Sequence, residues 1–167
     1  MNTSFERGKD RTDEWYTPKH IIDSLTCAGA NFELDPCTFV NPPYQIAKNT
    51  FNKYQDGLTK DWFGNVWCNP PYSTFLIKKF IAKLASHGNG IALIFNRMDN
   101  SLWHELIFPN ADAILILRGR LRFMNIDGVV SDPAGCGSVL VAFGKENAEC
   151  LERCGIDGKF INLKNER

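Results

Sequence analysis

The tetrapeptide Asn-Pro-Pro-Tyr stands at two places in the chain, residues 41–44 and residues 69–72. Its residue types suit one reaction, the alkylation of an amino group on a heteroaromatic ring. Such a nitrogen is a poor nucleophile because its lone pair is delocalised into the ring. An asparagine side-chain oxygen and the next proline's carbonyl can accept the two amino hydrogens and draw the nitrogen toward tetrahedral geometry. The prolines fix where that carbonyl points, and the tyrosine ring offers a stacking face. This chemistry requires neither a metal ion nor a strong base.

Chain position favours the second copy of the motif. Asn69 follows an apolar run, residues 64–68, and precedes a long amphipathic pattern. It is therefore expected at the carboxyl end of a strand, where open α/β sheets bind ligands. The first copy begins six residues after Asp35. That is too soon for the next parallel strand, whose crossover takes about a dozen residues or more, so residues 41–44 should form a loop or start an irregular helix. We expect the catalytic residues to be Asn69, Pro70, Pro71 and Tyr72, with a plain strand-to-helix turn as the alternative.

The methyl donor expected for such an amine is S-adenosylmethionine (AdoMet), and residues 13–18, DEWYTP, are the first candidate for its site. A helix that starts at Thr17 and Pro18, capped by Thr17, would direct backbone N–H groups and a hydroxyl toward the methionine carboxylate. Trp15 and Tyr16 could pack on the adenosine or on the sulfonium carbon. An ordinary capped helix with aromatic residues at its start fits the same pattern.

Two acidic segments are further candidates for the cofactor site. Asp35 and Pro36 end a short predicted strand at residues 31–37, where the carboxylate could receive the methionine ammonium or the ribose hydroxyls. Asp56 could hold the ribose or the adenine, although its Asp-Gly sequence is also that of a simple turn.

The surrounding pattern alternates strands with helices. Residues 90–96 and 111–117 have the continuous apolar character of strands that are buried on both faces. Ser73 is expected to cap a helix that Gly88 closes. The order of elements predicts a three-layer α/β domain with a mostly parallel sheet and an antiparallel C-terminal hairpin. The predicted helices cover residues 17–29, 73–88 and 100–108, and a final helix and strand follow Gly144.

Alternating arginines follow the last apolar strand. If residues 118–123 form a strand, Arg118, Arg120 and Arg122 project from one face of it. Such a row suits DNA phosphates or a guanine edge, and an ordinary solvated strand face is the alternative. A turn is expected at residues 125–128, with residues 137–143 as the antiparallel partner strand. The loop at residues 124–137 is the segment we expect to read bases.

Composition fits one folded domain, residues 14–167, behind a polar and flexible lead-in at residues 1–13. The formal net charge is zero, so no global basic field indicates a nucleic-acid partner. The six cysteines show no C-x-x-C spacing, which favours reduced thiols over disulfides or zinc. No signal pattern or membrane-length apolar run is visible, so a cytoplasmic location, no membrane association and no metal are expected.

Five segments together resemble the phage-type DNA adenine-N6 methyltransferases, in the same order along the chain from about residue 13 to residue 144. The segments are DEWYTP, FELDPCT, DGLTKDW, WCNPPYS and LRGRLRF. The resemblance implies a Rossmann-like AdoMet-dependent fold, double-stranded DNA as partner, flipping of the target base, and protection of phage DNA from restriction. It places residues 69–72 in catalysis and Trp15, Thr17, Pro18, Asp35 and Asp56 around AdoMet.

One feature departs from this family pattern. AdoMet enzymes commonly have a glycine-rich loop after the first strand, whereas CTFVNPPY follows Asp35 and Pro36 here. Residues 131–138, SDPAGCGS, look more like such a loop, but the segments around them fit a cofactor half poorly. The alternatives in function are methylation of a protein glutamine or an RNA base, and an inactive relative that binds DNA or AdoMet.

Overall fold

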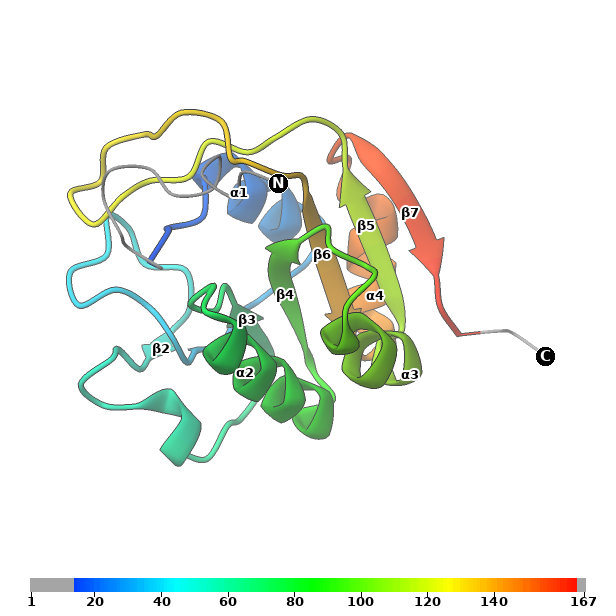
Figure 1. Cartoon of the computed structure of the whole chain (residues 1–167), viewed down its shortest axis with the longest axis horizontal. Coiled ribbons are helices and arrows are strands. Elements are labelled where there is room, and N and C mark those ends of the chain that lie inside the picture. Colours follow the sequence, from blue (N-terminus) through cyan, green and yellow to red (C-terminus); the bar gives the residue numbers. More distant parts are fainter. Residues whose placement is uncertain (1–13, 165–167) are drawn as a thin grey trace.

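The computed structural model describes residues 14–164, so the predicted lead-in lies outside the described residues. The described part contains one seven-stranded sheet with the strand order β2-β1-β3-β4-β6-β5-β7 (Figure 1). Its strands are β1 (Leu34–Asp35), β2 (Asn49–Thr50), β3 (Val66–Cys68), β4 (Gly90–Phe95), β5 (Ala113–Leu117), β6 (Ser138–Phe143) and β7 (Gly158–Asn162). The helices are α1 (Lys19–Cys27), α2 (Thr74–His87), α3 (Phe108–Asn110) and α4 (Lys145–Arg153), with a 3₁₀ turn η2 (Gly57–Thr59) and a π-helical segment η3 (Leu102–Ile107).

The sheet is mostly parallel. Strands β2, β1, β3 and β4 pair in parallel. Strand β6 is inserted between β4 and β5 and runs antiparallel to both, so β5 has the same direction as β4. Strand β7 closes the other edge antiparallel to β5. The predicted Rossmann-like α/β class, with antiparallel pairing at the C-terminal end, is confirmed.

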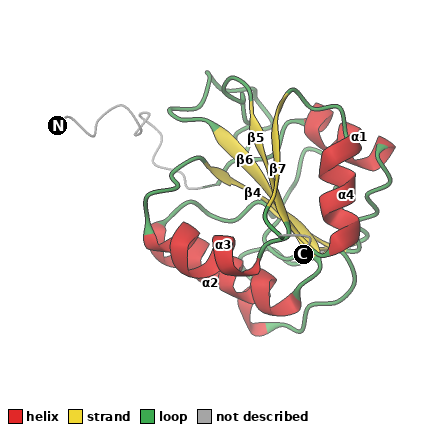
Figure 2. Ribbon diagram, turned by 90° about the vertical axis from the view of Figure 1, so that its right-hand side faces the viewer, coloured by secondary structure: helices red, strands yellow, loops and turns green. Residues whose placement is uncertain are grey.

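Helices cover both faces of the sheet, which explains the continuous apolar runs in its central strands (Figure 2). Along β4, Ile91 and Leu93 belong to the core shared with α1 and α4, whereas Ala92 and Ile94 belong to the core shared with α2 and η3. Because successive side chains of a strand point to opposite faces, a strand between two helix layers must be apolar at every position.

The ends of α2 follow the sequence prediction, and the start of α1 does not. The Ser73 side chain accepts a hydrogen bond from the Leu76 N–H at 3.4 Å, and Gly88 ends α2 with a φ of 77°. Helix α1 begins after Pro18, which has no side-chain cap. The prediction that Thr17 caps this helix is wrong, because the Thr17 hydroxyl instead accepts a hydrogen bond from the Asn69 side chain.

The predicted strand at residues 118–123 is also wrong. Gly119, with a φ of 77°, turns the chain after β5, and the following residues form an irregular hairpin. The turn expected at residues 125–128 is present, with the Gly128 N–H bonded to the Asn125 carbonyl at 3.0 Å. The returning limb is residues 129–134, not residues 137–143, because β6 is already paired on both sides by β4 and β5.

The first copy of the tetrapeptide lies in the loop between β1 and β2, as position alone predicted. That loop lies on the same side of the molecule as the hairpin that follows β5 (Figure 1). A side chain added at Gly128 in the hairpin would lie 3.5 Å from the Pro43 ring, so the two loops approach closely.

The longest helix among residues 14–164 is α2, with 14 residues. None of the described helices meets the length of about 20 apolar residues that a bilayer span requires.

Candidate functional site

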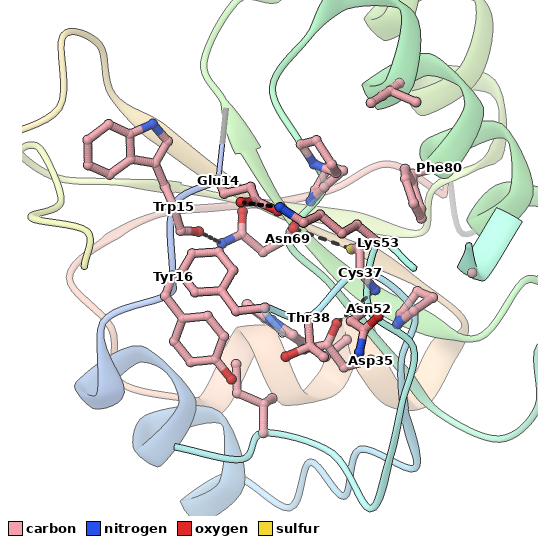
Figure 3. Close-up of a pocket in the computed structure, with 18 of the residues that line it drawn as sticks. Glu14, Trp15, Tyr16, Asp35, Cys37, Thr38, Asn52, Lys53, Asn69 and Phe80 are labelled. Carbon is pink, nitrogen blue, oxygen red and sulfur yellow. Dashed lines mark hydrogen bonds and ion pairs between the residues drawn. The ribbon is translucent and has the colours of Figure 1, made fainter. Parts of the chain in front are cut away.

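A cavity of about 280 Å³ lies at the carboxyl ends of β1 and β3 (Figure 3). Its walls come from residues 14–17, 35–39, 52–53, 56–58, 67 and 69–71, together with Ile46 and two side chains of α2, Leu76 and Phe80. The residues of the sequence prediction that line it are Trp15, Tyr16, Thr17, Asp35, Pro36, Asp56, Asn69, Pro70 and Pro71. Pro18 and Tyr72 do not line it.

The side-chain amide of Asn69 is held by hydrogen bonds on both sides. Its Nδ2 donates to the Trp15 carbonyl at 2.6 Å and to the Thr17 Oγ1 at 3.2 Å. A backbone carbonyl can only accept, so this contact fixes the amino group of the amide toward Trp15. The Asn69 Oδ1 therefore faces the other way, where it accepts a hydrogen bond from the Tyr72 hydroxyl at 2.8 Å.

The ring of Tyr72 belongs to an aromatic cluster. It stacks on Phe95 with a centroid distance of 4.2 Å and meets Phe123 edge-on at 6.4 Å. Its hydroxyl also lies 3.1 Å from the Leu93 carbonyl oxygen, and burial raises the pKa of this hydroxyl well above its usual value. One face of the ring is therefore occupied by Phe95.

The segment at residues 15–17 connects the site to two loops. The Tyr16 backbone pairs with Met124 through hydrogen bonds of 2.8 and 3.0 Å, which joins the segment to the hairpin after β5. The Tyr16 hydroxyl donates to the Tyr44 carbonyl, and the Tyr44 hydroxyl donates back to the Thr17 carbonyl. Tyr44 is the tyrosine of the first tetrapeptide, so both copies of the motif contact this segment.

Asp35 is a buried carboxyl group on the cavity wall. Its side chain is only 3% exposed, and the loss of hydration raises its pKa to about 7, although the Cys37 backbone N–H donates to its Oδ1 at 3.1 Å. None of the ion pairs found between described residues includes Asp35. A buried carboxyl without a cationic partner suits a cationic ligand.

Two cysteines lie beside Asn69. The Cys37 thiol donates to the Asn69 carbonyl at 3.3 Å, and its sulfur lies 3.9 Å from that of Cys68. This separation is well beyond the roughly 2.05 Å of a disulfide bond, and the six cysteines, all among the described residues, form no disulfide bonds with one another.

Gly57 lets the turn at η2 approach the loop after β1 closely. A Cβ at Gly57 would lie 2.0 Å from the Pro36 carbonyl oxygen, so only glycine lets the two segments touch. The Trp62 indole N–H holds the Gly57 carbonyl at 2.8 Å. Asp56 caps the turn by accepting from the Leu58 N–H at 3.2 Å, so it is both the turn residue and part of the cavity wall.

The three arginines are exposed but lie outside the cavity. The neighbouring side chains Leu121 and Phe123 are buried, so the predicted alternation of burial holds although no regular strand forms. The Nη1 atom of Arg118 is 3.9 Å from the Oδ2 atom of Asp157, the residue before the edge strand β7. The hairpin beyond the arginines exposes three apolar side chains, Ile126, Val129 and Val130.

Several cavity residues were not anticipated from the sequence. Cys37 and Thr38 follow Asp35 and Pro36, so the end of the strand was a usable signal for them. Phe80 lies one turn beyond Leu76 on the same face of α2 and could have been found from helical spacing. Glu14 and Lys53 form an ion pair of 3.8 Å beside the cavity (Figure 3). No local signal indicated this pairing, because the two residues are far apart in sequence.

A protein-family model described as DNA N-6-adenine-methyltransferase (Dam) matches residues 5–152 of the chain. Comparisons with curated proteins and with solved structures gave no match. Among the described residues, no group of three or more histidine, cysteine, aspartate or glutamate side chains is arranged to hold a metal ion.

Replacing Gly57 with alanine should distort the cavity, because the new methyl group would overlap the Pro36 carbonyl. We expect a loss of about 1–3 kcal/mol in the free energy of unfolding, measured by urea denaturation. Gly137→Ala is the matched control, since its added Cβ would meet nothing closer than 3.9 Å. A Gly57→Ala protein as stable as the control would show that the approach to Pro36 is not tight.

Proposed function

The chain belongs to the Dam family of DNA N-6-adenine-methyltransferases, and on that basis we propose that it transfers a methyl group from AdoMet to N6 of an adenine flipped out of double-stranded DNA. The observation that carries this proposal is the oriented amide of Asn69. It lies at the end of β3 beside a cavity of small-molecule size, between a buried carboxyl group and an aromatic cluster.

The cavity residues fit AdoMet in chemistry. The volume of about 280 Å³ is close to the lower end of the roughly 300–1,000 Å³ typical of small-molecule pockets. Asp35 would receive the ammonium group of the methionine moiety, because burying a carboxylate is favourable only when a cation accompanies it. Trp15 would pack on the adenosine, and Asp56 would accept hydrogen bonds from the ribose. Tyr16 and Pro18 are buried, so we assign them to shaping the site.

The acceptor side follows from the geometry of residues 69–72. Oδ1 of Asn69 accepts one hydrogen bond from Tyr72, and its second lone pair is available for an amino hydrogen of the substrate. We assign the second amino hydrogen to the Pro70 carbonyl, whose direction Pro71 restricts. When bound, AdoMet would supply a sulfonium-activated methyl group. The N6 lone pair would form the new C–N bond while the S–C bond breaks and leaves its electron pair on sulfur. One N6 proton would pass to water.

The DNA face would comprise the exposed arginines and the hairpin at residues 124–137. Arg120 and Arg122 are exposed beside this hairpin, which is joined to the cavity wall by the pairing of Met124 with Tyr16. Guanidinium groups at this position suit phosphates. The apolar tip of the hairpin, Ile126, Val129 and Val130, suits contact with bases in a groove. The Tyr72 face opposite Phe95 would stack on the flipped adenine.

Asn69→Ala should abolish methyl transfer and weaken AdoMet binding far less, because the amide acts on the acceptor amine and reaches the donor site only through the cavity wall and its bonds to residues 15–17. Incorporation of tritiated methyl groups into duplex DNA would be measured, with calorimetry of AdoMet binding as the control. Wild-type protein that labels RNA or protein in place of DNA would contradict the proposed acceptor. An Asn69→Ala variant with normal turnover would contradict the catalytic role of Asn69.

AdoMet affinity should rise with pH through about 7. Burial favours the protonated form of Asp35 and raises its pKa to about 7, whereas an ammonium ligand requires the ionised form. We therefore expect binding near pH 6 to be about tenfold weaker than near pH 7.5. Calorimetry over this range would measure the effect. Asp35→Asn should bind more weakly and show no such slope; a wild-type affinity independent of pH would contradict the contact with Asp35.

Arg120→Ala and Arg122→Ala should each weaken DNA binding and reduce the salt dependence of the affinity by about one phosphate contact. Fluorescence anisotropy at several salt concentrations would measure both effects. Lys145→Ala is the control. Lys145 comes shortly after the last residue of β6, which pairs with the first residue of β4, so it lies at the opposite end of the strands from the carboxyl ends of the parallel strands. Equal salt slopes for the arginine variants and the control would place the DNA elsewhere.

A further inference from the structure

We propose that Thr17 and Tyr44 are positioning residues that set the orientation of the catalytic amide of Asn69, so that the first copy of the tetrapeptide supports the second. This inference rests on the proposed function. It assigns to the Thr17 hydroxyl a role toward Asn69 in place of the role in helix capping that the sequence suggested.

The side-chain amide of Asn69 must present its oxygen, and not its amino group, to the substrate. Reaction at an exocyclic amine requires the amide to present its oxygen, because its amino group would point donor hydrogens at the donor hydrogens of the substrate. An asparagine side chain can rotate its amide by half a turn with little change in shape. The orientation must therefore be enforced by neighbours that can only accept a hydrogen bond, or that are placed to do so.

Two neighbouring oxygen atoms enforce this orientation of the Asn69 amide. The Trp15 carbonyl, 2.6 Å from Nδ2, is an acceptor by nature. The Thr17 hydroxyl, 3.2 Å from the same nitrogen, is the only side-chain atom of the described residues found to accept from it. Thr17 is completely buried, so water does not compete for this contact. Together the two acceptors use both hydrogens of the Asn69 amino group and leave its oxygen toward Tyr72.

Two tyrosine hydroxyls hold the backbone around Thr17 in place. The Tyr44 hydroxyl donates to the Thr17 carbonyl, and the Tyr16 hydroxyl donates to the Tyr44 carbonyl, which fastens the segment at residues 15–17 to the first tetrapeptide. The rings of Tyr16 and Tyr44 also pack edge-to-face with a centroid distance of 5.1 Å. Burial raises the pKa of both hydroxyls, so they remain protonated donors. Tyr44 thus acts on Asn69 through Thr17.

The experiment compares four variants in the DNA methylation assay, with kcat, the dissociation constant of AdoMet and the thermal midpoint measured for each. Thr17→Val keeps the shape of the side chain and removes the acceptor, and Thr17→Ser keeps the hydroxyl. Tyr44→Phe removes one hydroxyl from a buried ring. Its matched control is Tyr54→Phe, since Tyr54 is 79% exposed and lies outside the site.

We expect Thr17→Val to lower kcat about tenfold while AdoMet affinity stays within about twofold, and Thr17→Ser to restore most of the rate. Tyr44→Phe should lower kcat about threefold, whereas Tyr54→Phe should not. The inference is overturned if Thr17→Val keeps the wild-type kcat, or if its loss appears in AdoMet affinity alone. If Thr17→Val does not fold, a Tyr44→Phe protein with unchanged kcat overturns the inference equally. A wild-type protein that methylates no DNA would instead refute the proposed function.

Discussion

The arrangement of the site depends on the hydrogen bonds from one side-chain amino group, that of Asn69, to the segment at residues 15–17. These contacts join residues that are 54 and 52 positions apart in the chain. They bring the end of β3 against the segment before α1, and that segment is bonded in turn to the hairpin after β5. The cavity and the faces proposed to hold the reactive amide and the DNA therefore meet at a single short stretch of backbone, residues 15–17.

The two copies of Asn-Pro-Pro-Tyr differ in what precedes them, and this difference decides what each can do. The copy at residues 69–72 follows the central parallel strand β3, so it lies at the carboxyl end of the strands, where open α/β sheets bind ligands. The copy at residues 41–44 lies in a loop, where the prolines restrict the backbone and the tyrosine reaches back to Thr17. In the proposed function, the same four residues therefore provide catalysis in one setting and support in the other.

Burial has opposite uses for the polar groups of the cavity. The Thr17 hydroxyl is buried and satisfied by Asn69, which fixes a geometry. The Asp35 carboxyl is buried and forms none of the ion pairs found between described residues; its burial raises its pKa, and in the proposed function this group receives the ammonium of AdoMet. Gly57 allows this crowding, because its missing side chain lets the turn at η2 contact Pro36.

Local patterns in the sequence determined the three-layer α/β class, the burial of the central strands, the position of Asn69 at a strand end and the contrast between the two motif copies, because these depend on short-range periodicity. The tertiary structure alone decided the rest. The Thr17 hydroxyl bonds Asn69 and not its own helix, β6 pairs with β4 and β5 and not with residues 118–123, and Gly57 meets Pro36. Each of these is a contact between segments distant in sequence, and no local pattern encodes which of several possible partners a polar group or a strand edge will find.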